Sequence, residues 1–205
     1  MKLLTKYISK QFANPSGVGG RTVASVMNQQ NRKQYQAVLD NINIQPTDTI
    51  LDIGFGNGYL IGNLLKHHPA KICGIEISRD MLTLVSRKHR QDVSMEKLDL
   101  HLADIKALPF DDAYFDKICT VNTLYFWNNA DRSFAEIERT LKPGGISLNV
   151  FYSKDFLDNM AHAQYGYSKY SIEQVVKMTE KSGLKVVRVI EIQTEMSYCV
   201  IAKKE

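Results

Sequence analysis

The order of strand-like and helical segments is the feature of this sequence that most limits its fold. From about residue 48 onward, short apolar runs rich in β-branched residues alternate with longer segments of helical period. The strand-like runs lie near residues 49–53, 71–75, 98–102, 115–120 and 145–150, and the helical segments between them lie near 59–66, 79–90 and 132–141. This alternation predicts an α/β fold, in which helices cover a parallel sheet.

The C-terminal part departs from this alternation. A helix is expected near residues 172–182, ended by Gly183, and two β-rich runs follow near 185–192 and 198–202. Only a few residues separate these two runs, whereas a parallel crossover needs a dozen or more. They therefore predict a hairpin, so that a mostly parallel sheet is finished by an antiparallel C-terminal strand.

Length and composition favour a single domain. The 205 residues suffice for one well-buried core, and the 44% hydrophobic and 23% charged content is that of an ordinary globular protein. We expect the core at residues 45–205, preceded by an N-terminal arm and helix at 1–44. A turn-rich stretch at 12–20 precedes an amphipathic helix that carries Val23, Met27, Val38 and Ile42. The arm is either a surface segment beside a packing helix or a lid that closes over a ligand, with its glycines as hinges.

Charge and reactive residues exclude several classes of function. The net charge of +4 comes from lysines and arginines spread along the chain, which disfavours a nucleic-acid partner. The cysteines Cys73, Cys119 and Cys199 each lie in an apolar run and are expected to be buried, and no histidine–carboxylate spacing indicates a metal site. Neither a membrane span nor a secretory signal is apparent. We expect a cytoplasmic protein, monomeric or homodimeric.

A glycine-rich turn follows the first predicted strand. The segment Leu51-Asp52-Ile53-Gly54-Phe55-Gly56-Asn57-Gly58 lies where that strand leads into a helix, and a side chain at Gly54 or Gly56 would block the close approach of a ligand. The spacing is G-x-G-x-G, not the G-x-G-x-x-G that is typical of dinucleotide sites. Asp52 would repel a pyrophosphate, but its charge suits the ammonium group of an amino-acid cofactor.

Two further acidic residues end the next two strands. Glu76 is placed to accept hydrogen bonds from two ribose hydroxyls, and Asp104 from the exocyclic amine of adenine, with Ile77 and Ile105 as apolar covers for the ring. Each acid alone could instead cap a helix or turn. Three acids at the ends of consecutive strands, the first beside a glycine turn, are harder to explain by capping.

These motifs resemble those of the class I S-adenosylmethionine-dependent methyltransferases over roughly residues 45–150. The segment 108–116 is similar to the lead into that family's fourth strand, and Lys142-Pro143-Gly144-Gly145 to the turn before its fifth. Among subfamilies, the chain is most similar to small-molecule methyltransferases of the ubiquinone and menaquinone biosynthesis type. The resemblance implies a Rossmann-like, doubly wound, seven-stranded sheet of order 3-2-1-4-5-7-6, with strand 7 antiparallel, in a three-layer αβα sandwich.

The same resemblance implies S-adenosylmethionine as the cofactor. The residues that it assigns to cofactor binding are Asp52, Gly54, Phe55, Gly56, Gly58, Glu76, Ile77, Met81, Asp104, Ile105 and Asn122.

The exit of the fourth strand, residues 121–127, is expected to border the reacting methyl group. It departs from the Asn-Pro-Pro-Tyr motif of enzymes that methylate DNA amines or glutamine. We place the acceptor pocket at Phe12, Tyr125, Trp127 and Tyr152, although clustered aromatic residues also serve as plain packing. Tyr125, His162 and Tyr152 are candidate bases without further support, so the catalytic residue stays unassigned.

Four functions are compatible with these patterns. The first is methyl transfer to a small-molecule acceptor by in-line displacement, since no separate recognition domain is apparent. The second is methylation of RNA or protein, which the net charge of +4 allows. The third is cofactor binding without catalysis, because no base is identified. A nicotinamide-dependent oxidoreductase is the fourth, and it rests on the glycine turn and Glu76.

Overall fold

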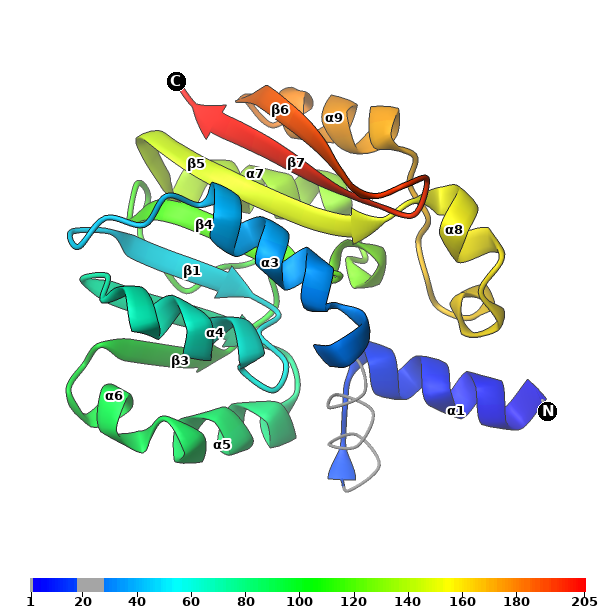
Figure 1. Ribbon diagram of the computed structural model, residues 1–205, viewed down its shortest axis with the longest axis horizontal. Helices are drawn as coiled ribbons and strands as arrows, with labels where there is room; N and C mark the ends of the chain where they lie inside the picture. Colours follow the sequence, from blue (N-terminus) through cyan, green and yellow to red (C-terminus); the bar gives the residue numbers. More distant parts are fainter. Residues whose placement is uncertain (1, 18–27) are drawn as a thin grey trace.

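The computed structural model describes residues 2–17 and 28–205, and its centre is one seven-stranded sheet (Figure 1). The strand order is β3-β2-β1-β4-β5-β7-β6. Strands β1 to β5 pair in parallel, and β7 is antiparallel to both of its neighbours, β5 and β6. This order and the antiparallel last strand confirm the prediction. The strands are β1 (Thr49–Ile53), β2 (Lys71–Glu76), β3 (Leu98–Leu102), β4 (Phe115–Val121), β5 (Leu141–Tyr152), β6 (Leu184–Gln193) and β7 (Ser197–Lys204).

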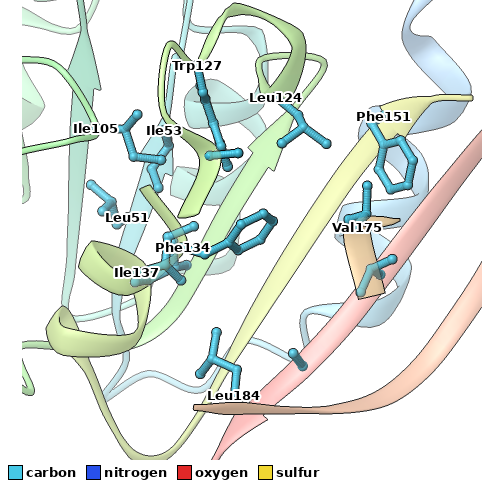
Figure 2. Packing of buried hydrophobic residues seen from close by; sticks show 14 of the residues in the cluster. Leu51, Ile53, Ile105, Leu124, Trp127, Phe134, Ile137, Phe151, Val175 and Leu184 are labelled. Carbon is cyan, nitrogen blue, oxygen red and sulfur yellow. The ribbon is translucent and has the colours of Figure 1, made fainter. Parts of the chain in front are cut away.

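Helices cover both faces of the sheet, so the molecule has three layers (Figure 1). One apolar cluster joins α3, α4 and α5 to one face, and a second joins α7, α8 and α9 to the other. Figure 2 shows the second cluster, where Phe134 and Ile137 of α7 lie over Leu51 and Ile53 of β1. The helices are α1 (Lys2–Ala13), α3 (Arg32–Asn41), α4 (Tyr59–Leu64), α5 (Arg79–Lys88), α6 (Arg90–Ser94), α7 (Ala130–Thr140), α8 (Lys154–Asp158) and α9 (Ile172–Lys181), and short 3-10 turns lie at Leu65–His67, Leu124–Phe126 and Ala161–Gln164.

The N-terminal region differs from its prediction. Residues 2–13 form α1, a helix that we did not predict; glycine and proline first occur at Pro15 and Gly17, after the helix has ended. Of the expected amphipathic helix, α3 is present, and it buries Val38 and Ile42 against the sheet. Val23 and Met27 lie outside the described residues. The 1–44 and 45–205 division stays a prediction.

Two other boundaries also moved. The helix predicted at 79–90 is divided at His89 into α5 and α6, because His89 leaves the helical conformation. The turn at Pro143-Gly144-Gly145 is included in β5 as an irregularity: Phe115 pairs with Leu141, but Lys117 pairs with Ile146. In the part of the chain that the structure describes, no helix is both long and apolar enough to cross a membrane.

Candidate functional site

The ends of β1, β2 and β4 meet at one edge of the sheet and border a cavity. Three other segments complete the walls of the cavity: the loop after β3, the end of α1 with the residues that follow it, and α3. Nine of the eleven residues predicted to bind the cofactor line this cavity, and they are Asp52, Gly54, Phe55, Gly56, Glu76, Ile77, Asp104, Ile105 and Asn122. Of the predicted acceptor residues, Phe12 and Trp127 line it. Segments that are far apart in the sequence therefore meet as expected.

Backbone contacts hold the glycine turn, and its first two glycines differ in the space around their Cβ positions. The Gly54 N–H donates to Ile75 O at 2.8 Å, and φ of Gly54 is +72°. A Cβ at Gly54 would lie 2.5 Å from Cγ2 of Thr123, so a side chain there would strain the protein itself before it met a ligand. Gly56, with φ of +54°, has no described atom within 4 Å of such a Cβ. Gly56 is therefore the glycine whose side-chain position is open toward the cavity.

Glu76 is a buried carboxylate held by three backbone N–H groups. Its Oε2 accepts from Gly56 at 2.9 Å, and its Oε1 accepts from Ile77 at 2.8 Å and from Ser78 at 2.9 Å. Burial raises the pKa of Glu76, and the three hydrogen bonds act in the opposite direction. Because an ionised carboxylate has about four acceptor positions, one remains for a ligand hydroxyl.

Asp52 is a buried carboxylate without a compensating partner. It is 2% exposed, and its Oδ2 has no hydrogen-bond partner among the described residues. Burial, and then repulsion from Glu76, raise the pKa of Asp52 to about 8. A buried carboxylate that lacks a countercharge is costly to ionise, so a cationic ligand group beside it would be strongly favoured.

Asn122 presents a free donor to the same cavity. It is 6% exposed and adopts φ of +59° at the end of β4. Its Oδ1 accepts from the Tyr125 hydroxyl at 2.6 Å, whereas its Nδ2 has no partner within the described parts of the chain. Among the buried side-chain atoms that line the cavity in the described residues, Oδ2 of Asp52 and Nδ2 of Asn122 lack a partner. Such a pair complements the ammonium and carboxylate groups of an amino acid.

Asp104 is the most exposed of the three acids. Its side chain is 42% exposed, lies 3.0 Å from Lys106 Nζ, and accepts from the Lys106 N–H at 3.1 Å. The local turn thus uses part of its hydrogen-bonding capacity, as the capping alternative anticipated. Beside it, Ile105 is buried and Ile77 is exposed, and both line the cavity.

Four predicted residues lie behind the cavity wall. Gly58 ends the turn at φ of +73°, and a Cβ there would lie 2.9 Å from Val85. Met81, a residue of α5, is fully buried. The Tyr125 hydroxyl holds Asn122, and the Tyr152 hydroxyl donates to Oδ1 of Asn31 at 3.2 Å. Met81, Tyr125 and Tyr152 do not line the cavity because their side chains pack against other residues. Gly58 does not line it either, and its Cβ position faces Val85.

One wall of the cavity was not predicted. Tyr35 lines it from α3, Asn31 from the N-cap of that helix and Asn28 from the helical residues 28–30 before it, and Phe126 joins them from the loop after β4. The spacing of three and then four residues puts 28, 31 and 35 on one helical face, which is the signal that could have identified them. Burial and the nearby Asp52 raise the pKa of Tyr35, so its phenol is neutral at physiological pH.

Comparison with known proteins agrees with this geometry. Residues 51–148 match the model of a family described as a methyltransferase domain. The chain carries the methyltransferase domain of the class I S-adenosylmethionine-dependent family. Its cofactor is S-adenosylmethionine. The free Asp52 and Asn122 atoms fit the amino-acid end of that molecule.

Relatives of this methyltransferase domain include proteins of similar length. It is 28% identical to the uncharacterized methyltransferase YdaC of Bacillus subtilis, over 87% of this chain and 96% of the relative. It is 26% identical to a demethylmenaquinone methyltransferase of Oceanobacillus iheyensis, over 77% of this chain and 67% of that protein. A solved chain from a Haloferax volcanii complex of a methyltransferase with the Trm112 activator has a TM-score of 0.79 at 19% identity, with 96% of each chain covered. The last likeness shows the fold.

Proposed function

We propose that this methyltransferase transfers a methyl group to a small-molecule acceptor by in-line displacement. The observation that supports it is the set of aromatic side chains that line the cavity from outside the glycine turn. Phe12 from the arm, Tyr35 from α3, and Phe126 and Trp127 from the loop after β4 line the cavity. Two chain segments from outside the parallel sheet thus enclose the space beside the cofactor edge, which suits an acceptor small enough to enter it.

The residues divide the work between holding the cofactor and holding the acceptor. Glu76 would accept from a ribose hydroxyl, Asp104 from the adenine amine, and Asp52 and Asn122 would bind the amino-acid end. When bound, S-adenosylmethionine supplies a methyl group on a sulfonium: an acceptor lone pair forms the new bond as the C–S bond breaks, S-adenosylhomocysteine leaves, and the acceptor loses its proton.

Among the described residues, no base lies on the acceptor side of the cavity. Of the described lining residues, the titratable ones are Tyr35, Asp52, Glu76 and Asp104. The three acids belong to the cofactor side. The base candidates Tyr125, Tyr152 and His162 do not line the cavity, and burial raises the pKa of Tyr125 and Tyr152. Positioning of the acceptor lone pair against the methyl group would then provide most of the acceleration, and water would take the proton.

The test is transfer of a labelled methyl group from S-adenosylmethionine to a panel of small aromatic hydroxyl and amine compounds, with total RNA and unfolded protein as competing acceptors. Label in small products supports the proposal if it is lost in Phe126→Ala and retained in Glu138→Ala, which removes an ion pair with Lys204 and does not alter the cavity lining. Label only in RNA or protein would refute it. Tight binding of S-adenosylhomocysteine without any transfer would favour a cofactor-binding protein that does not catalyse.

A further inference from the structure

Ser78, the residue before α5, connects the cofactor edge to the arm. Its backbone N–H donates to Oε1 of Glu76 at 2.9 Å, and its hydroxyl accepts from the Met81 N–H at 3.3 Å as the N-cap of α5. The same hydroxyl donates to the carbonyl of Pro15 at 2.5 Å. Ser78 is 2% exposed and Pro15 is buried, so this last hydrogen bond is shielded from water.

A second hydrogen bond joins the same two segments. The Gly17 N–H donates to Oδ2 of Asp80, in the first turn of α5, at 2.6 Å. Pro15 and Gly17 of the arm thus contact the N-cap and the first turn of α5, and the residues of each pair are two positions apart. We call the Ser78–Pro15 and Asp80–Gly17 hydrogen bonds the arm clasp. Because one of the two is buried, the clasp holds the arm more firmly than a surface contact would.

The arm is also anchored farther along α1. The Ser9 hydroxyl donates to the carbonyl of Tyr165 at 2.5 Å, and the Phe12 ring stacks on His162 with centroids 4.6 Å apart. Phe12, Ala13 and Pro15, which lie from this anchor to the clasp, line the cavity. The arm therefore crosses the cavity between two attachment points.

We propose that Ser78 is a positioning residue that couples retention of the cofactor to closure of the arm. This proposal rests on the proposed function only because both concern the same cavity. A continuous series of hydrogen bonds runs from the Gly56 N–H through Glu76 and Ser78 to Pro15. Ser78 does not line the cavity, so removing its hydroxyl would loosen the arm without deleting a side chain of the lining. By thermodynamic reciprocity, a cofactor that contacts the closed arm also shifts the equilibrium of the arm toward the closed form.

The experiment measures two quantities on the full-length protein. Stopped-flow gives the dissociation rate of S-adenosylhomocysteine, and mass spectrometry gives the rate of tryptic cleavage after the exposed Lys10 of the arm with that ligand bound. In Ser78→Ala and Asp80→Ala we expect both rates to rise about three- to tenfold, as loss of one hydrogen bond predicts. Ser78→Thr keeps a hydroxyl and should restore most of the wild-type behaviour.

Two matched variants separate this role from a general loss of stability. Ser171→Ala removes the N-cap of α9, and Asp131→Ala removes the first-turn acid of α7, both away from the cavity. Neither should change ligand dissociation or cleavage after Lys10. Wild-type rates in both Ser78→Ala and Asp80→Ala, or equal acceleration in the two controls, would overturn the proposal. If Ser78→Ala does not fold, Asp80→Ala alone decides. This experiment contains no methyl acceptor, so its result does not depend on the proposed function. Failure of the proposed function would be seen in the separate methyl-transfer assay.

Discussion

The two sides of the cavity are built from contacts of very different range. On the cofactor side, the hydrogen bonds of Glu76 reach residues 1, 2 and 20 positions away. On the acceptor side, the Tyr152–Asn31 hydrogen bond spans 121 positions, and the Ser9–Tyr165 bond spans 156. The Glu76 contacts of the first wall lie between the turn after β1 and the start of α5, whereas the second wall depends on side chains from three distant segments. Binding of cofactor should therefore be separable from binding of acceptor.

Glu76→Gln should have the largest effect on the cofactor side. An amide has one acceptor oxygen for three backbone N–H groups and turns an N–H donor toward one of them. We expect the affinity for S-adenosylhomocysteine to fall about 100-fold by isothermal titration. Glu136→Gln is the control, because Glu136 also accepts from a backbone N–H, that of Leu108, but does not line the cavity. An equal loss of affinity in both variants would show that the substitutions act by disturbing the fold.

The pKa of Asp52 predicts a pH dependence of cofactor binding. At a pKa of about 8, the free protein carries a protonated Asp52 at pH 6, whereas an ammonium ligand prefers the ionised form. Affinity for S-adenosylhomocysteine should therefore rise about tenfold per pH unit from 6 to 8. Asp52→Asn should bind weakly at every pH in this range. A wild-type affinity that is flat over the range would contradict the role of Asp52.

The same carboxyl has the opposite effect on stability without ligand. The pKa of Asp52 is about 8 in the folded protein and about 3.9 in the unfolded chain. The stabilisation that Asp52 adds to the free energy of unfolding is therefore complete below the unfolded pKa and is lost as pH rises through 8. From pH 6 to 8 the melting temperature of the wild type should fall, relative to that of Asp52→Asn, by about 3 °C per pH unit. Parallel melting curves for the two proteins would show that Asp52 is ionised throughout.

Two glycines test whether the turn contacts the ligand or only bends the chain. Gly56 and Gly144 both have positive φ and open space at the Cβ position, and only Gly56 lines the cavity. Alanine at either position should cost about 1 kcal/mol of unfolding free energy. Only Gly56→Ala should also weaken S-adenosylhomocysteine binding, by about tenfold in isothermal titration. Unchanged binding in that variant would remove the turn from the site.

Phe126→Leu should have the smallest effect, confined to the acceptor side. The change shortens an apolar wall of the cavity without touching the glycine turn or Glu76. We expect kcat/KM for a small acceptor to fall about fivefold, as is usual for a trimmed hydrophobic pocket. The affinity for S-adenosylhomocysteine should stay within about twofold of the wild type. A parallel loss of cofactor affinity would show that the two sides are not separable.

The strand and helix patterns of the chain predict a parallel sheet with an antiparallel C-terminal hairpin and most of the cofactor side, whereas the strand order came from the resemblance to the methyltransferase family. The glycine turn, Glu76 and Asp104 follow successive strands of a parallel sheet, so their meeting at one edge depends only on strand direction. The antiparallel hairpin follows from the few residues between its strands. These are short-range constraints, which hold for any packing of the rest of the chain.

The acceptor side and the separate roles of the glycines follow from contacts between distant segments of the chain. That Gly54 faces Thr123 depends on β1 lying beside β4, which no local pattern encodes. That Tyr125 and Tyr152 stand behind the wall, while Tyr35 of α3 lines the cavity, depends on which side chains reach Asn122 and Asn31. Local hydrogen bonds and sterics act along the chain and are visible in its sequence, whereas contacts between distant segments exist only once the core has packed.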